Sequence, residues 1–153
     1  IQGDEPFIKP EQIESIMACF DSPGTQIATL VRAFEECEGW EALSNPNSPK
    51  VVLNDNSEAM LFSRSVIPYI RGCEPDEWLK HHTFYKHIGM YAYRSDVLEE
   101  ITRLPQSSLE LSESLEQLRW LQNGYKIKVG ITTQETVGID TPEDMIKALT
   151  LLS

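Results

Sequence analysis

The chain opens with the stretch Ile1-Gln2-Gly3-Asp4-Glu5-Pro6, in which an apolar residue leads into two acids and a proline. Pro6 cannot donate a hydrogen bond to a sheet ladder and biases Glu5 toward an extended backbone, so a strand is predicted to end here. Gly3 allows the chain to turn closely beside a ligand. Asp4 is therefore a candidate carboxylate at the carboxyl end of a strand, where open α/β sheets place their ligand sites.

A second acidic stretch, Gly138-Ile139-Asp140-Thr141-Pro142-Glu143-Asp144, lies near the other end of the chain. Thr141 can cap a helix and Pro142 suits its first position, so Asp140 also precedes a predicted helix. An Asp in this place is most often a cap or a solvated turn residue. The spacing alone thus leaves two interpretations of Asp4 and Asp140 open: a shared divalent-metal site or two ordinary turn residues.

Length and composition are those of one ordinary globular domain. The chain has 153 residues, of which 41% are hydrophobic and 24% charged. Its net charge of −11 excludes a broad basic surface for nucleic acid, and no apolar run reaches membrane-spanning length. Cys19, Cys37 and Cys73 lack metal-type spacing, which indicates mostly buried free thiols in a reducing compartment. The chain starts without Met, and we expect it to lack its natural beginning.

Apolar periodicity predicts helices and strands in alternation. We expect helices over residues 10–20, 34–43 and 96–104, a further one after 107, and one from 142 onward. We expect strands over residues 26–31, 50–54, 59–63, 85–93 and 127–132, with a loop or lid over 70–82. The alternation favours an α/β layer fold, and the hairpin formed by 50–54 and 59–63 makes its sheet mixed. Ser95 is expected to cap the helix over 96–104.

The helix after residue 107 carries the clearest capping signal. Ser107 and Glu110 have the spacing of a capping box, and Gly124 is placed to end the helix. Its apolar face is expected to consist of Leu111, Leu115 and Leu118. Glu113 and Gln117 lie one turn apart on another face. By pattern alone that second face is an ordinary solvated one.

Five stretches occur in an order that points to a family. They are Gln2–Pro6, Phe62–Pro68, Lys86–Arg94, Leu115–Arg119 and Gly138–Asp144. As an ordered set they resemble the 3-deoxy-manno-octulosonate (Kdo) cytidylyltransferases, the CMP-Kdo synthetases of lipopolysaccharide synthesis. The resemblance runs over essentially the whole chain, whereas any one stretch alone would be a weak signal.

The resemblance implies a fold and a reaction. The fold would be a Rossmann-like α/β fold of the glycosyltransferase-A type, with a mixed sheet flanked by helices. The reaction would join CTP and Kdo to give CMP-Kdo and pyrophosphate, with Mg²⁺ binding the triphosphate and the sugar oxygens. Family members are cytoplasmic homodimers, which implies neither a membrane nor a nucleic-acid partner.

The resemblance also assigns the two carboxylates that pattern alone left open. Asp4 and Asp140 match the family's metal ligands, and Mg²⁺ is commonly bound through one or two carboxylates with water and phosphate completing its shell. Gln2 matches a residue near the sugar, where an amide can both donate and accept a hydrogen bond.

Further residues match positions that face the sugar. Arg64 matches the residue that grips the Kdo carboxylate, for which a planar guanidinium is suited, although by pattern alone it is an exposed arginine at a strand end. His87 would reach sugar hydroxyls, although by pattern alone a single histidine on such a strand is more often a satisfied structural residue. Tyr91 shares its strand face by the period of two. Tyr91 can pack against the sugar or fill the core. Glu113 and Gln117 match polar residues turned toward Kdo hydroxyls.

The chain departs from the family by an absence. The Pro-Ala-Arg phosphate-binding loop and the strands of the cytosine pocket are missing from the 153 residues. We therefore expect this chain to be inactive on CTP by itself, and its uncovered sheet edges to be paired in an oligomer.

Three alternative functions stay open at this point. The first is a cytidylyltransferase for another acidic sugar such as sialic acid. The second is a non-catalytic module that binds an acidic sugar or dimerises, and the third is an acidic protein without a ligand. The Phe62–Pro68 and Leu115–Arg119 stretches favour Kdo over sialic acid.

Overall fold

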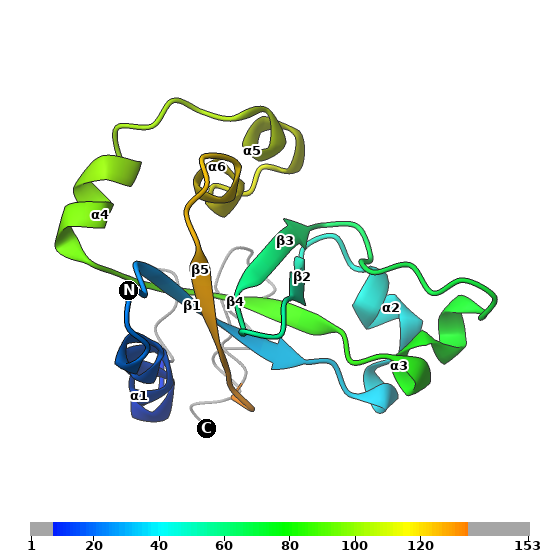
Figure 1. The fold of residues 1–153 in the computed structure, drawn as a ribbon. Helices are drawn as coiled ribbons and strands as arrows, with labels where there is room; N and C mark the ends of the chain where they lie inside the picture. Colours follow the sequence, from blue (N-terminus) through cyan, green and yellow to red (C-terminus); the bar gives the residue numbers. More distant parts are fainter. Residues whose placement is uncertain (1–7, 135–153) are drawn as a thin grey trace, which may run out of the picture.

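The structure, a computed structural model, describes residues 8–134 (Figure 1). Gln2, Asp4, Asp140 and the helix expected after residue 142 lie outside the described residues. The strands are β1 (Ile27–Ala33), β2 (Lys50–Leu53), β3 (Ala59–Ser63), β4 (Tyr85–Tyr93) and β5 (Ile127–Ile131). The α-helices are α1 (Pro10–Ala18), α2 (Gly39–Ser44), α3 (Trp78–His81), α4 (Ser95–Ile101), α5 (Ser108–Glu113) and α6 (Gln117–Gln122). Short 3-10 turns are η1 (Cys19–Asp21), η2 (Glu36–Glu38) and η3 (Pro75–Glu77).

The strands form one five-stranded sheet in the order β3-β2-β4-β1-β5. β1 pairs with β4 antiparallel and with β5 parallel, so the predicted mixed sheet is confirmed. β2 and β3 form the predicted hairpin, and β2 joins it to the sheet through β4. The hairpin turn also reaches β5, where the Val129 amide donates to the Ser57 carbonyl at 2.8 Å.

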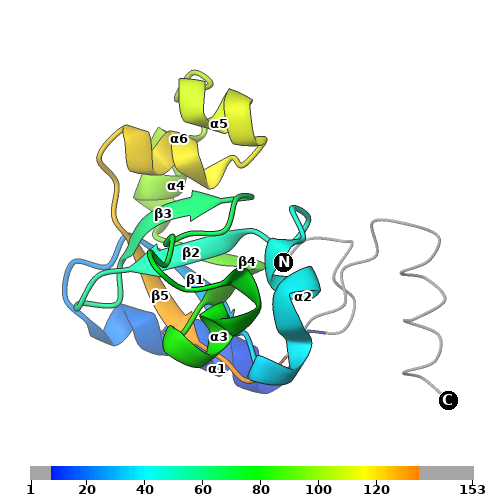
Figure 2. The same ribbon diagram turned by 90° about the vertical axis from the view of Figure 1, so that its right-hand side faces the viewer.

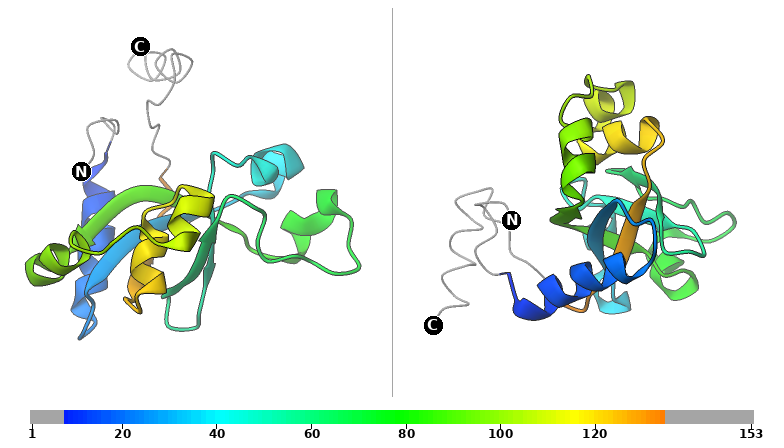
Figure 3. Two further views of the ribbon diagram at one scale, coloured as in Figure 1. Left: turned by 90° about the horizontal axis from the view of Figure 1, so that it is seen from above. Right: turned by 60° about the vertical axis from the view of Figure 1, so that its left-hand side comes forward.

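Helices cover both faces of this sheet, as the views from further sides show (Figures 2 and 3). α1 covers one face over a core of Ile16, Cys19, Ala28, Leu30, Ile88 and Met90. α4 and α6 cover the other face, and the buried apolar residues there include Ile27, Val31, Phe62, Val97, Ile101, Leu118 and Trp120. A third cluster of Phe34, Leu43, Trp78 and Phe84 gathers α2 and α3. Alternate residues along β1 and β4 thus serve opposite cores, as the pleat requires.

The helix predicted after residue 107 is broken, and this part of the prediction is wrong. The capping box is confirmed: the Glu110 amide donates to Ser107 Oγ at 3.3 Å, and the Ser107 amide to Glu110 Oε2 at 3.1 Å. α5 nevertheless ends at Glu113, because Ser114 turns left-handed with a φ of 51°. Leu111 is 62% exposed and is not part of the core, whereas Leu115 and Leu118 are buried in it, so the expected leucine face is confirmed only for the last two residues.

Smaller expectations also need correction. Residues 70–82 are not all loop, because η3 and α3 form there and bury Trp78. Arg94, not Ser95, occupies the position before α4 that a capping residue would take. The helix expected over 34–43 begins only at Glu36, as the turn η2. The cysteines are free as predicted, but only Cys19 is buried.

Close packing of α1 on the sheet leads to a first prediction. A Cβ added at Gly130 of β5 would lie 2.8 Å from Leu30 Cδ2 and 3.2 Å from the carbonyl oxygen of Ser15. Gly130→Val should therefore lower the free energy of unfolding by about 1–3 kcal/mol through overpacking. Urea unfolding measures the change. Ile131→Thr, at the next and exposed residue of the same strand, should stay within about 0.5 kcal/mol of the wild type. Equal stability of both variants would show that α1 does not pack this closely.

Candidate functional site

Arg64 and Glu113, two of the predicted sugar-binding residues, lie far apart in the sequence but meet where β3 ends beside α5. Glu113 Oε1 accepts a hydrogen bond from Ser63 Oγ at 2.6 Å, and Oε2 accepts one from the Arg64 amide at 2.9 Å. Arg64 Nε donates in turn to the Glu113 carbonyl oxygen at 2.6 Å. The two residues thus join the hairpin to the helical layer. The guanidinium thus satisfies a carbonyl that has no partner within the helix at the end of α5.

The charge states of this junction follow from its contacts. Burial would raise the pKa of the Glu113 carboxyl, but the hydrogen bonds from Ser63 and Arg64 and the nearby cations bring its pKa below the ordinary value. The Arg64 guanidinium makes its hydrogen bonds to backbone carbonyls, including that of Pro46 at 2.9 Å. Within residues 8–134, these carbonyl bonds leave the positive charge of Arg64 without a direct ion pair.

Lys50 adds a second cation that sequence reasoning missed. Its side chain is fully buried at the start of β2, and Nζ donates to the Asn45 carbonyl at 2.9 Å. Burial lowers the pKa of Lys50 to about 8, with Glu113 raising it and Arg64 lowering it. Lys50, Arg64 and Glu113 together carry one net positive charge below that pH. The sequence pattern predicts Lys50 as the first residue of a hairpin strand, and no local pattern indicates that it is buried.

His87 and Tyr91 lie together on β4, which confirms that they share a strand face. Their ring centroids are 5.3 Å apart. The Phe62 ring stands edge-on to His87 at 5.1 Å, and Trp120 of α6 stands edge-on to Tyr91 at 5.2 Å. Because Phe62 directly precedes Ser63, the aromatic rings and the charged junction are joined through one strand end.

His87 is held neutral at physiological pH. Burial lowers the pKa of its imidazole to about 3, so the ring does not add to the positive charge of the junction. Nε2 lies 3.0 Å from Thr29 Oγ1 of the neighbouring strand β1. The Tyr91 hydroxyl is buried and approaches Thr29, but it makes no hydrogen bond of ordinary geometry within residues 8–134. Burial raises the pKa of Tyr91 well above its usual value, so its hydroxyl keeps its proton.

Gln117 is the first residue of α6 and is buried, with 5% of its surface exposed. The break at Ser114 places Gln117 and Glu113 in separate helices, so they do not form the continuous helix face that was predicted. The sugar contacts proposed for both residues stay predictions.

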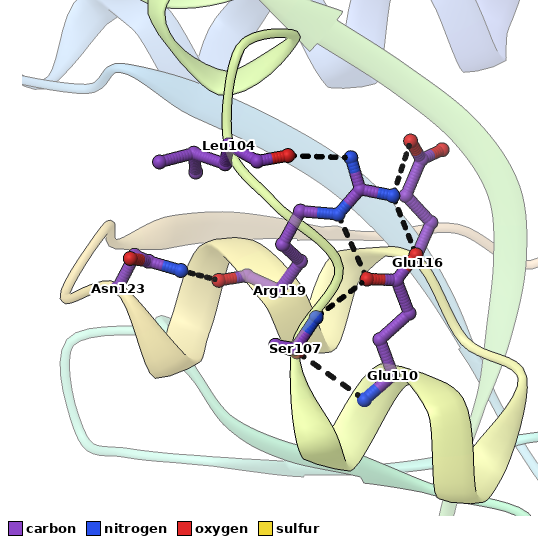
Figure 4. A network of polar contacts seen from close by, with 6 residues as sticks. All are labelled: Leu104, Ser107, Glu110, Glu116, Arg119 and Asn123. Atoms are coloured by element: carbon purple, nitrogen blue, oxygen red, sulfur yellow. Dashed lines mark hydrogen bonds and ion pairs between the residues drawn. The ribbon is translucent and has the colours of Figure 1, made fainter.

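A buried ion pair fixes α5 against α6 across that break (Figure 4). Arg119 Nε donates to Glu110 Oε2 at 2.8 Å, and its Nη2 binds the other carboxylate oxygen. The side chains of Arg119 and Glu110 are only 13% and 8% exposed. Hydrogen bonds from Arg119 and the Ser107 amide outweigh burial and bring the pKa of Glu110 below its ordinary value. Such a two-pronged pair sets the relative orientation of the two helices that carry Glu113 and Gln117.

The described residues leave the metal prediction untested. Between residues 8 and 134, no group of three or more His, Cys, Asp or Glu side chains could hold a metal ion. Asp4 and Asp140, the predicted ligands, lie outside that range. In the same part of the chain, no helix combines the length and the apolar character needed to cross a bilayer.

This arrangement defines an α/β nucleotidyltransferase fold, which a solved structure shares. That structure, described as CMP:2-keto-3-deoxy-manno-octonic acid synthetase complexed with CTP, matches with a TM-score of 0.85 and 38% identity. The match covers 99% of this chain and 59% of the other. The family model for cytidylyltransferases matches residues 1–127. The chain belongs to the cytidylyltransferase family.

Curated relatives carry a more specific name. A 3-deoxy-manno-octulosonate cytidylyltransferase of Parabacteroides distasonis is 71% identical over 100% of this chain and 61% of its own length. A protein of the same name from Bacteroides thetaiotaomicron is 66% identical over 95% of this chain and 58% of its own length. The chain therefore spans about three fifths of the length of the relatives that it matches.

The buried pair between α5 and α6 yields a stability prediction. Arg119→Met leaves the Glu110 carboxylate buried without its cation, so the midpoint of urea unfolding should fall clearly. Arg103→Met is the matched control, because its ion pair with Glu99 joins side chains that are 75% and 68% exposed. The control should unfold at the wild-type midpoint. Equal midpoints for the two variants would contradict the structural role of Arg119.

The low pKa of His87 yields a pH prediction. The folded-state pKa of about 3 lies below the ordinary 6.5, so the unfolded state binds more protons between these values. The stability that a neutral His87 provides is present above pH 6.5 and is lost as the pH falls toward 3. Between pH 7.5 and 4 the wild type should lose about 3 kcal/mol more unfolding free energy than His87→Gln.

Urea unfolding at a series of pH values measures this difference. His81→Gln replaces an exposed histidine and should follow the wild-type curve. Parallel curves for the wild type and His87→Gln would mean that His87 titrates normally.

Proposed function

We propose that this chain is the sugar-binding part of a cytidylyltransferase that activates Kdo with CTP, giving CMP-Kdo and pyrophosphate for lipopolysaccharide synthesis. The names of the curated relatives and the CTP complex of the similar solved structure support this proposal. Kdo is favoured over sialic acid because the relatives are named for it. Because the chain spans about three fifths of those relatives, catalysis with CTP is proposed to need groups beyond these 153 residues.

One observation supports the part of the proposal that concerns the sugar substrate, namely the charge of the junction. Among residues 8–134, Lys50 and Arg64 outnumber the carboxylate of Glu113 at this junction, so these three side chains carry one excess positive charge at neutral pH. A sugar acid brings one carboxylate, which a guanidinium can bind through two hydrogen bonds. The neutral His87 offers a polar ring atom for a hydroxyl of a polyol, and Tyr91 packs beside it against the core. An acidic sugar therefore fits this site better than a neutral one.

Mg²⁺ dependence belongs to the same proposal. Asp4 and Asp140 supply the hard oxygen ligands that Mg²⁺ prefers, and the family resemblance assigns them that role. When bound, the metal would neutralise the charge of the triphosphate. Arg64 would orient the sugar carboxylate, and His87 and Gln117 would fix its hydroxyls. A cytoplasmic homodimer is proposed on the family resemblance alone.

Sugar binding is tested by isothermal titration of the chain with Kdo, sialic acid and a neutral octose. The wild type should bind Kdo and fail to bind the neutral sugar. Arg64→Gln should weaken Kdo binding by at least about tenfold, since it removes the charge that faces the carboxylate. Arg103→Gln, at an exposed arginine of similar size, should leave the affinity unchanged. Equal affinity for Kdo and the neutral octose would refute the carboxylate site.

Catalysis is tested by following CMP-Kdo and pyrophosphate with CTP and Mg²⁺ present. The full-length Parabacteroides distasonis relative serves as the positive control, and this chain alone should form no product. If the affinity of the chain for Kdo does not change when CTP and Mg²⁺ are added, the result would instead support the alternative of a non-catalytic module that binds an acidic sugar.

A further inference from the structure

Thr29 lies at the centre of β1 and contacts the strand that carries the proposed sugar residues. Its side chain is fully buried. Oγ1 lies 2.7 Å from the Met90 carbonyl oxygen, 3.3 Å from that of Ile88 and 3.0 Å from His87 Nε2. One hydroxyl thus meets two backbone carbonyls and one imidazole nitrogen, all of them on β4.

A bulge in β4 brings these groups together. The register passes from Thr29 opposite Tyr91 to Leu30 opposite Ile88, so Gly89 and Met90 have no partner residue on β1. A bulge interrupts the backbone ladder, and a buried carbonyl there needs another donor. The hydroxyl of Thr29 provides that donor for Met90. The two inserted residues are an even number, so His87 and Tyr91 still point to the same side of the sheet.

Counting protons then fixes the state of the histidine. A hydroxyl carries one proton and two acceptor lone pairs. The 2.7 Å contact with the Met90 carbonyl uses that proton, because a carbonyl oxygen has none to give. Only lone pairs of Oγ1 are left for His87, so the ring must donate an N–H from Nε2. Since burial keeps the imidazole neutral, Nδ1 then carries no proton.

We propose that Thr29 is a positioning residue of the sugar site, which holds His87 as its Nε2–H tautomer and leaves Nδ1 as a hydrogen-bond acceptor for a sugar hydroxyl. This inference rests on the proposed function for its ligand, but not for the tautomer itself. The opposite tautomer would present an N–H at Nδ1 and would compete for the single proton of Thr29. His87 is of intermediate exposure, and its Nδ1 is not among the side-chain atoms of residues 8–134 that are buried without a hydrogen-bond partner.

The tautomer is read directly from the ring nitrogen resonances of ¹⁵N-histidine-labelled chain at pH 7. In the wild type, Nε2 of His87 should show a protonated, pyrrole-type shift and Nδ1 an unprotonated, pyridine-type shift. His87→Gln assigns the signals. Thr29→Val has nearly the shape of the native side chain but lacks the hydroxyl, so the ring should lose its single tautomer. Thr29→Ser keeps the hydroxyl and should restore the wild-type pattern.

Isothermal titration with Kdo gives the second readout. Thr29→Val should weaken Kdo binding by about tenfold, a typical loss for one hydrogen bond, and Thr29→Ser should stay within about twofold of the wild type. A loss caused only by destabilisation would leave the tautomer pattern of the folded fraction unchanged. If Thr29→Val does not fold, the wild-type and Thr29→Ser spectra still decide the tautomer.

The outcomes separate this inference from the proposed function. A wild-type spectrum with an unprotonated Nε2 overturns the role of Thr29, whatever the sugar does. A changed tautomer in Thr29→Val with unchanged Kdo affinity overturns its role in the site. A wild-type chain with the expected tautomer that binds no Kdo overturns the proposed function, and the spectra still establish that Thr29 controls His87.

Discussion

The candidate site depends on the hydrogen bonds between the Glu113 carboxylate and the end of β3. The carboxylate accepts hydrogen bonds from the Ser63 hydroxyl and the Arg64 amide, while the Arg64 side chain bonds the backbone at the end of α5. These hydrogen bonds satisfy the Arg64 amide at the strand end and the Glu113 carbonyl at the helix end, which have no partner within their own elements. α5 ends at this point, and α6 begins in a new direction, with Gln117 as its first residue. The end of β3, the end of α5 and the side chain of Arg64 are therefore joined in one set of hydrogen bonds.

The sheet contributes a second constraint through its bulge. The two unpaired residues of β4 keep His87 and Tyr91 on the same face but leave a buried carbonyl to be satisfied from the side. The Thr29 hydroxyl donates a hydrogen bond to the Met90 carbonyl and also contacts the imidazole of His87. A backbone irregularity and the protonation of a side chain are thus coupled through one hydroxyl. Bulges that re-aim side chains beside a site are a recurrent device in sheets.

Much of the fold could be predicted from sequence because its strands are strongly patterned. The bounds of β4 and the hairpin of β2 and β3 agree with the predictions, since each strand has a clear apolar pattern bordered by turn residues. The break at Ser114 could not be predicted, because a leucine spacing compatible with a helix continues through it. Local spacing contains no information about Arg64, which approaches from a strand distant in sequence. Tertiary hydrogen bonds overrode helical propensity at that point.

The sequence by itself determined the α/β class, the mixed sheet and the family, because periodicity and ordered motifs are local properties of the chain. It also placed His87 and Tyr91 on one strand face, which the period of two guarantees. Only the tertiary structure decided that Glu113 meets Arg64, that Lys50 is buried beside them, and that Thr29 controls the proton of His87. These are contacts between residues many positions apart, and their hydrogen-bond donors and acceptors become matched only when the sheet and helices pack and exclude water.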